Sequence, residues 1–322
     1  MNSEPKTHLY SPFPNLISPH AAQLQADINH WISQFTLVSS ADATKFAAGQ
    51  FGWLTARAYP LANYERLNII AQCMVWTFAN DDYHDHMDAT ELAALHQRFL
   101  AVLRGATPSA NDSSQCGLLA FLRDQLHTVA PVGWMERFIQ SVDDYLAGTR
   151  WEAPLRISAA VPDLATYLEM RQYTIAVYLF TNLIEIANNL MLSVEVIEHP
   201  IIKRLTYLCN AVISWCNDLY SYQKEHAGEV MNLVFVLQAE YGLSLSAAVT
   251  QAIAIHDADV REFVALKQQV PHFDTETDIQ VRQYIHNLET WMRGHITWYE
   301  VDTQRYGKNH DVFVVEQRRI AA

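Results

Sequence analysis

Glycine and proline are scarce in this sequence, which has 10 glycines and 11 prolines among 322 residues. Because tight turns depend on these two residues, their scarcity argues against an all-β chain. Half of the residues are hydrophobic, and long stretches are rich in Ala, Leu, Gln, Glu and Arg, which favour helices. The composition therefore predicts an all-α protein with a sizeable core.

Positive charge is also in short supply. The chain has 22 Lys and Arg residues against 35 Asp and Glu residues, which gives a formal net charge of −13. No basic patch with interleaved aromatic residues is present, so we expect no nucleic-acid partner. An acidic protein can still bind an anion if metal cations bridge the two.

The sequence lacks CxxC pairs and long uncharged apolar runs. Its four cysteines stand in apolar, helix-like sequence, which predicts buried free thiols in a reducing compartment. No apolar run reaches the roughly 20 residues of a membrane helix, and the N-terminus does not resemble a secretory signal. We therefore expect a cytoplasmic protein without a membrane span.

Helical periodicity dominates the remaining pattern. It predicts one helical bundle with a central cavity, formed by an N-terminal strap (1–20), a helical domain (21–306) and a C-terminal tail (307–322). The segment 174–192 is apolar on more than one stripe, which is typical of a helix in the middle of a protein. Helices are expected at about 21–37, 41–57, 63–86, 89–104, 114–128, 131–148, 163–192, 198–226, 229–241, 244–269 and 274–300.

The first chemical motif is a cluster of carboxylates at the end of the expected helix 63–86. Asp81, Asp82 and Asp85 lie three or four residues apart, so they share one helix face. A helix C-terminus disfavours negative charge, and divalent cations would relieve that cost. Carboxylate oxygens suit Mg²⁺. The alternative is a solvated acidic helix end.

A second motif lies near the end of the expected helix 198–226. Asn217, Ser221 and Glu225 recur every four residues and form one oxygen-bearing stripe. An amide carbonyl, a hydroxyl and a carboxylate are again suitable ligands for Mg²⁺. The alternative is an ordinary amphipathic helix end, although an Asn and a Ser that continue a buried helix require polar partners.

Together these motifs resemble those of bacterial class I terpene synthases. Asp81, Asp82 and Asp85 are similar to the family's DDxxD motif, and residues 217–225 match its NDxxSxxKE signature at every defined position. The resemblance extends from about residue 45 to residue 306. It implies a class I terpenoid synthase fold with the active site inside the helical bundle.

The resemblance also implies a diphosphate sensor. The family carries an arginine at a set distance upstream of the second motif, and Arg171 occupies that place. Arginine suits the role because its planar group holds phosphate oxygens in pairs and stays charged. By the same resemblance Thr174 is the linker in a broken central helix, and Ile175 contributes its main-chain carbonyl where glycine is common. The alternative is that Arg171 is an ordinary surface residue.

Further substrate contacts are implied near the C-terminus. Arg305 and Tyr306 resemble the family's arginine–tyrosine pair over the diphosphate, although the spacing from Trp298 to Arg305 is one residue longer than in the family. Lys224 is expected to bind the diphosphate as well. Aromatic rings can stabilise a carbocation, and we expect Phe78 and Trp298 to line the cavity, although most aromatics at helical spacing are merely core.

The implied activity is that of a terpene synthase. Three Mg²⁺ ions, as the resemblance implies, would help an isoprenyl diphosphate to lose diphosphate, and the carbocation would cyclise or rearrange. Farnesyl diphosphate is the expected substrate and a sesquiterpene the expected product; geranyl and geranylgeranyl diphosphate are alternatives.

Other classes stay open at this stage. A chain-elongating isoprenyl diphosphate synthase would carry a second aspartate-rich motif in place of residues 217–225, and a non-catalytic helical protein would not need both stripes. His84 and His86 allow a metal-dependent phosphohydrolase, but further histidines in helical context would be required. The oligomeric state, including a homodimer, is also open.

Overall fold

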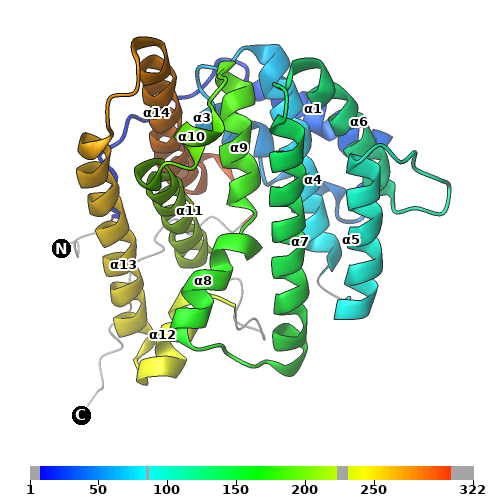
Figure 1. Cartoon of the computed structure of the whole chain (residues 1–322). Coiled ribbons are helices and arrows are strands. Elements are labelled where there is room, and N and C mark those ends of the chain that lie inside the picture. The colour runs from blue at the N-terminus through cyan, green and yellow to red at the C-terminus, as the bar shows by residue number, and fades with distance from the viewer. Residues whose placement is uncertain (1–7, 85–86, 223–230, 306–322) are drawn as a thin grey trace.

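A computed structural model describes residues 8–84, 87–222 and 231–305 of the chain. These residues form helices and no strand, which confirms the predicted all-α fold (Figure 1). The α-helices are α1 (Ala21–Gln34), α2 (Ala43–Ala47), α3 (Phe51–Ala58), α4 (Tyr64–His84), α5 (Ala89–Leu103), α6 (Ser114–Val129), α7 (Trp134–Ser158), α8 (Leu164–Thr174), α9 (Val177–Asn188), α10 (Val194–Ile197), α11 (Pro200–Ser221), α12 (Leu233–Tyr241), α13 (Leu245–Leu266) and α14 (Thr275–Thr297). A 3₁₀ turn (Lys267–Gln269) follows α13, and a π-helical turn (Trp298–Asp302) follows α14.

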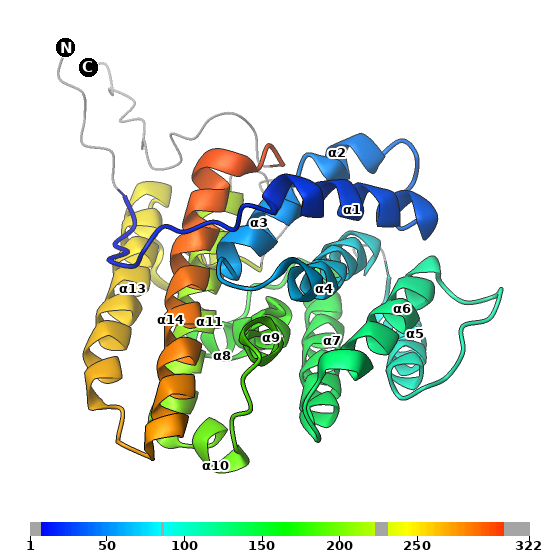
Figure 2. The ribbon, with the colours of Figure 1, turned by 90° about the horizontal axis from the view of Figure 1, so that it is seen from above.

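Helix α9 lies in the middle of the bundle, as its apolar sequence predicts. Figure 2 shows it nearly end-on, with α4, α7, α11 and α14 around it, and each of these helices contacts it. Nine of its residues are buried, including Glu185, which forms an ion pair with Arg137 of α7. Helix α9 can therefore form one wall of a central site, with residues from the surrounding helices forming the others.

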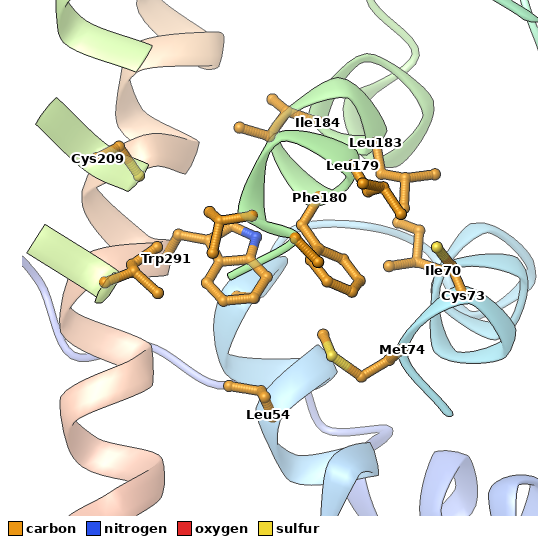
Figure 3. Packing of buried hydrophobic residues seen from close by; sticks show 14 of the residues in the cluster. Leu54, Ile70, Cys73, Met74, Leu179, Phe180, Leu183, Ile184, Cys209 and Trp291 are labelled. Atoms are coloured by element: carbon orange, nitrogen blue, oxygen red, sulfur yellow. The ribbon is translucent and has the colours of Figure 1, made fainter. Parts of the chain in front are cut away.

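The core around α9 is apolar and aromatic. In Figure 3, Phe180 of α9 and Trp291 of α14 face the side chains of Met74 from α4 and Leu54 from α3. All four side chains are buried, with exposed fractions of at most 3%. The four cysteines, Cys73, Cys116, Cys209 and Cys216, are buried free thiols, as predicted.

Helix α7 is longer than the sequence pattern indicates. The expected helix ended at residue 148, but α7 continues through Pro154 to Ser158. Gly148 is a close-packing position rather than a stop signal, because a Cβ atom there would lie 3.0 Å from the Cβ atom of Tyr173. The additional turns carry Glu152 toward the central cavity.

The N-terminal segment runs as an irregular strap across the helices before α1 begins (Figure 2). Phe13 packs against Phe263 of α13, and the Ser18 amide donates to the Ala56 carbonyl at 3.0 Å. Among the described residues no single helix is long and apolar enough to cross a membrane, although α12 and α13, joined by a bend of 118°, meet that length and composition together.

Candidate active site

The carboxylates of the first motif stand at the C-terminal end of α4. The side chains of Asp81 and Asp82 are exposed there, and both line a cavity of about 180 Å³ inside the bundle. Asn80, which precedes them, is buried and donates to the Tyr145 hydroxyl of α7 at 3.1 Å. This bond fixes the helix end against α7. Asp85 lies outside the described residues.

The second motif ends α11, at another edge of the same cavity. Asn217 lines the cavity, and Ser221, one turn further, is buried with its hydroxyl 3.5 Å from the Asn232 amide nitrogen. The Asn217 amide nitrogen donates to the hydroxyl of Tyr299 at 2.8 Å, which orients the amide. Lys224 and Glu225 lie outside the described residues.

Arg171 joins α8 to the end of α11. Its guanidinium donates to Asp218 Oδ1 at 2.9 and 3.1 Å, to Asn217 Oδ1 at 2.8 Å and to the Thr174 hydroxyl at 3.2 Å. The other Asp218 oxygen accepts from the buried Tyr167 hydroxyl at 2.5 Å. Arg171 thus belongs to a cavity-lining network and is not a plain surface residue.

Sequence reasoning missed the role of Asp218. The residue belongs to the second motif, but it was not placed among the functional residues. Its side chain is 1% exposed, and the Leu233 amide at the start of α12 also donates to it, at 3.0 Å. The sequence offers only a partial signal, which is that this carboxylate continues the mostly apolar helix segment 208–216, where a buried charge would require a partner.

A break in the helix lies three residues after Arg171, where the resemblance predicts one. Helix α8 ends at Thr174, α9 begins at Val177, and Ala176 between them has a φ of 63°. A left-handed backbone at a non-glycine residue costs about 1–3 kcal/mol, and such strain is concentrated at functional sites. Thr174 and Ile175 both line the cavity, so the break opens onto the site.

Arg305 lies at the end of α4, where it also lines the cavity. Its guanidinium donates to both Asp82 oxygens, at 2.5 and 3.1 Å, and lies 5.9 Å from the centre of the Phe78 ring. The structure therefore pairs Asp82 with an arginine, whereas the sequence analysis placed Asp82 among the metal ligands. Tyr306 lies outside the described residues.

The π-helical turn accounts for the longer spacing before Arg305. The Thr303 amide donates to the Trp298 carbonyl at 3.0 Å, five residues back, so the turn holds one residue more than an α-helical turn. Arg57 of α3 forms an ion pair with Asp302 in this turn. The additional residue is absorbed locally, and Arg305 still reaches the cavity mouth.

The two aromatic residues expected in the cavity have different places. Phe78 lines it, stacked on Phe51 at 4.2 Å between ring centres. Trp298 is fully buried behind Phe78, and its indole N–H donates to the Gly49 and Gln50 carbonyls at 2.9 and 3.2 Å. Its expected place on the cavity wall is therefore corrected: those bonds anchor it to the start of α3.

The residues of the cavity wall that escaped the sequence analysis include two charged side chains and one histidine. Glu152 and Arg156 lie on the part of α7 beyond the expected helix end, and His295 lies on α14 outside both motifs. Burial lowers the pKa of His295 to about 3, with a smaller contribution from the charge of Arg171. The imidazole is therefore neutral at pH values above about 3.

The donor set at the mouth suits divalent cations. Asp81 from α4 and Asn217 from α11 bring a carboxylate and an amide carbonyl to one cavity. The described residues contain no group of three or more His, Cys, Asp or Glu side chains arranged for a metal ion. Asp85 and Glu225, which complete the two motifs, fall outside those residues.

Comparisons with known proteins show which proteins the chain resembles. The family pattern described as "Terpene synthase family 2, C-terminal metal binding" matches residues 72–262. The chain is 36% identical over 96% of its length to (+)-T-muurolol synthase ((2E,6E)-farnesyl diphosphate cyclizing) from Roseiflexus castenholzii, 96% of which is covered. It is 33% identical to 10-epi-cubebol synthase from Sorangium cellulosum, with 93% of this chain and 98% of that protein covered. The crystal structure of a-eudesmol synthase has the same fold, with a TM-score of 0.83, 21% identity and coverage of 91% of this chain and 98% of that one.

Proposed function

The chain belongs to terpene synthase family 2, and on that premise we propose that it converts farnesyl diphosphate into a sesquiterpene and releases diphosphate. The substrate is proposed because one named relative cyclises farnesyl diphosphate and the alignment covers nearly the whole of both chains. Geranyl and geranylgeranyl diphosphate are the alternative substrates.

One observation carries the proposal. Asp81, Asn217, Arg171 and Arg305 come from four separate parts of the chain and line one cavity. Because the deeper wall of the same cavity is apolar and aromatic, a single molecule with an anionic head and a hydrocarbon tail would match both ends. An isoprenyl diphosphate is such a molecule.

The metal ions would bind at the end of the cavity that receives the anionic head of the substrate. The family's domain is described as metal binding, and we propose Mg²⁺, three ions in all, because the ligands are oxygen atoms. Asp81 and Asp85 would hold two of the ions, and Asn217, Ser221 and Glu225 would hold the third. The bound ions supply neutralisation of charge on the leaving diphosphate. Asp82 is less suited to this role while both of its oxygens accept from Arg305.

The basic residues would bind and orient the diphosphate. Arg171 is held by Asp218 and Asn217 next to the helix break, so its position is fixed before a ligand arrives. Arg305, at the end of α4, would contribute a second guanidinium, together with Lys224 and Tyr306. The main-chain carbonyl of Ile175 and the hydroxyl of Thr174 would lie beside the carbon–oxygen bond that breaks.

The aromatic wall would guide the cation. Phe78, Phe180 and Trp291 line the cavity, and the negative faces of such rings stabilise a nearby cation by about 0.5–2 kcal/mol each. The surrounding apolar side chains exclude water from the reactive intermediate. The order of ring closures depends on how this wall folds the chain.

The test is a product assay. The purified protein is incubated with Mg²⁺ and with farnesyl, geranyl or geranylgeranyl diphosphate, each with and without isopentenyl diphosphate, and products are identified by gas chromatography with mass spectrometry. We expect a C15 product from farnesyl diphosphate alone, and loss of that product in excess EDTA. Longer diphosphates would indicate chain elongation. No turnover of any substrate would contradict the proposal and favour a binding protein.

Two expectations about the cellular context accompany this proposal. Cytoplasmic location and the option of a homodimer stay predictions; fractionation of the source cells and light scattering of the purified protein would test them.

A further inference from the structure

Helix α14 places a histidine inside the cavity, between its apolar wall and its polar mouth. Trp291 and His295, one turn apart, both line the cavity. One turn further along, the Tyr299 hydroxyl accepts a hydrogen bond from Asn217 at the mouth. His295 therefore lies one helical turn below the end of the cavity where the diphosphate is proposed to bind.

The imidazole of His295 is fixed and has no hydrogen-bond partner within the described part of the chain. The side chain is 4% exposed, and Nδ1 is fully enclosed without a partner. The ring stacks on Trp298, with centres 5.9 Å apart and planes at 17°, and stands edge-on to Tyr299 at 5.0 Å. Because Nδ1 is enclosed, Nε2 is the nitrogen that can face the cavity.

A partnerless buried imidazole is unfavourable in purely structural terms. A buried polar group without a hydrogen bond costs about 1–3 kcal/mol, and a phenylalanine of similar shape would avoid that cost. Trp291 does not offset it, because no hydrogen bond joins its indole N–H to the imidazole, and that N–H is itself buried without a partner among the described residues. The position therefore suggests a chemical role rather than a packing role.

The arginines and two of the hydroxyls on the cavity wall are less suited than His295 to accept a proton, and the carboxylates on that wall are those of Asp81 and Asp82 at the mouth and of Glu152. Arg156, Arg171 and Arg305 stay protonated. The hydroxyls of Thr77 and Thr149 donate to the Cys73 and Leu146 carbonyls of their own helices, at 2.9 and 3.0 Å. Among the described residues that line the cavity, His295 is the only imidazole. Burial keeps it neutral, so it neither repels a carbocation nor arrives already protonated.

We propose that His295 is the base that ends the reaction, which rests on the proposed function. A C–H bond next to the cationic carbon breaks, its electron pair forms a carbon–carbon double bond, and the proton goes to the Nε2 lone pair of His295. If water adds first, the carbon–oxygen bond forms and the oxygen loses its proton to the same nitrogen. The imidazolium then passes the proton to an oxygen of the released diphosphate. A carbocation is a far stronger acid than an imidazolium ion, so the transfer is downhill.

The experiment compares His295→Phe and His295→Asn with the full-length protein. Phenylalanine keeps a flat ring without a basic nitrogen, and asparagine keeps a small polar side chain without one. Diphosphate release and product distribution are measured with farnesyl diphosphate and Mg²⁺. We expect the fraction of the main wild-type product to fall at least about tenfold in both variants, while the rate of diphosphate release changes by less than about threefold. His286→Phe on the same helix, outside this cavity, is the matched control and should keep the wild-type distribution.

Several outcomes would overturn the proposal. An unchanged product distribution in either folded variant would show that the basic nitrogen is not needed. If the rate of diphosphate release fell as much as the fraction of the main product, His295 would act in ionisation instead. If His295→Phe does not fold, judged by circular dichroism, His295→Asn alone decides. Failure of the proposed function looks different, because the wild-type protein would then release no diphosphate from any isoprenyl substrate.

Discussion

The C-terminal ends of α4 and α11 offer the same chemistry in different surroundings. Each end carries an aspartate held by one arginine, and the two helix ends face one cavity. At α11 the side chains of Arg171 and Asp218 are 12% and 1% exposed, whereas at α4 those of Arg305 and Asp82 are 5% and 38% exposed. The aspartate of the α11 end is thus built into the core, whereas the aspartate of the α4 end remains open to solvent.

This difference separates a fixed part of the site from an exchangeable one. The fixed part is held in place by several hydrogen bonds, and in the exchangeable part a ligand can replace one partner of the ion pair. Asp218 accepts hydrogen bonds from α8 and from the start of α12, so the Arg171 guanidinium has one position. Asp82 accepts from Arg305 alone among the hydrogen bonds of the described residues, and its own side chain is open to water, which weakens the ion pair. We therefore expect substitutions at the α11 end to affect folding and those at the α4 end to affect binding.

The largest effect is expected from Asp218→Asn. Loss of the charge leaves the Arg171 guanidinium, whose side chain is 12% exposed, without its counter-ion, which costs about 3–5 kcal/mol for a buried pair. The free energy of unfolding, measured with urea, should fall by that amount. Asp143→Asn on the exposed side of α7 serves as the control and should leave it unchanged within about 0.5 kcal/mol. If the two variants are equally stable, the ion pair at the α11 end is not needed for folding.

The double variant Asn217→Ala with Ser221→Ala tests the metal stripe directly. Both oxygen ligands are lost, and we expect the Mg²⁺-dependent rate of diphosphate release to fall by more than about 100-fold, since even weaker, indirect changes around metals cost 10–100-fold. The control is Asn29→Ala with Ser33→Ala, which has the same spacing on the exposed face of α1. Near-normal turnover of the first variant would refute the ligand assignment.

Tyr299→Phe tests how finely the α11 end is positioned. The substitution removes the partner of the Asn217 amide nitrogen and keeps the ring that packs on Tyr220 at 4.6 Å. Loss of one hydrogen bond of about 1 kcal/mol predicts a roughly fivefold lower kcat and a higher Mg²⁺ requirement. Tyr241→Phe, on the exposed end of α12, should have no effect on either quantity. A normal Mg²⁺ requirement in Tyr299→Phe would show that the amide is oriented without this bond.

Features that depend on local spacing were predictable from the sequence. The apolar pattern of 174–192 predicted the central helix, and the four-residue spacing of Asn217 and Ser221 predicted a shared face near the cavity. Arg171 required the family resemblance, because nothing in its neighbouring residues distinguishes it from a surface arginine.

Features that depend on tertiary packing were not predictable. The role of Asp218 requires the positions of Tyr167 and Leu233, 51 residues earlier and 15 residues later. Trp298 shares a helix face with His295 by spacing alone, but bonds to the start of α3 draw it behind Phe78. The length of α7 depends on how closely Gly148 approaches α8, which no local pattern encodes.

Asp82→Asn, the smallest expected effect on stability, is the sharpest test of the exchangeable end. The Asp82 side chain is 38% exposed, so the free energy of unfolding should change by less than about 1 kcal/mol. Arg305 loses a charged partner at the mouth, and the KM for the diphosphate substrate should change more than stability does. Urea denaturation and steady-state kinetics on one preparation give both quantities. A stability loss comparable to that of Asp218→Asn would mean that the Arg305–Asp82 pair is structural and that the two helix ends are equivalent.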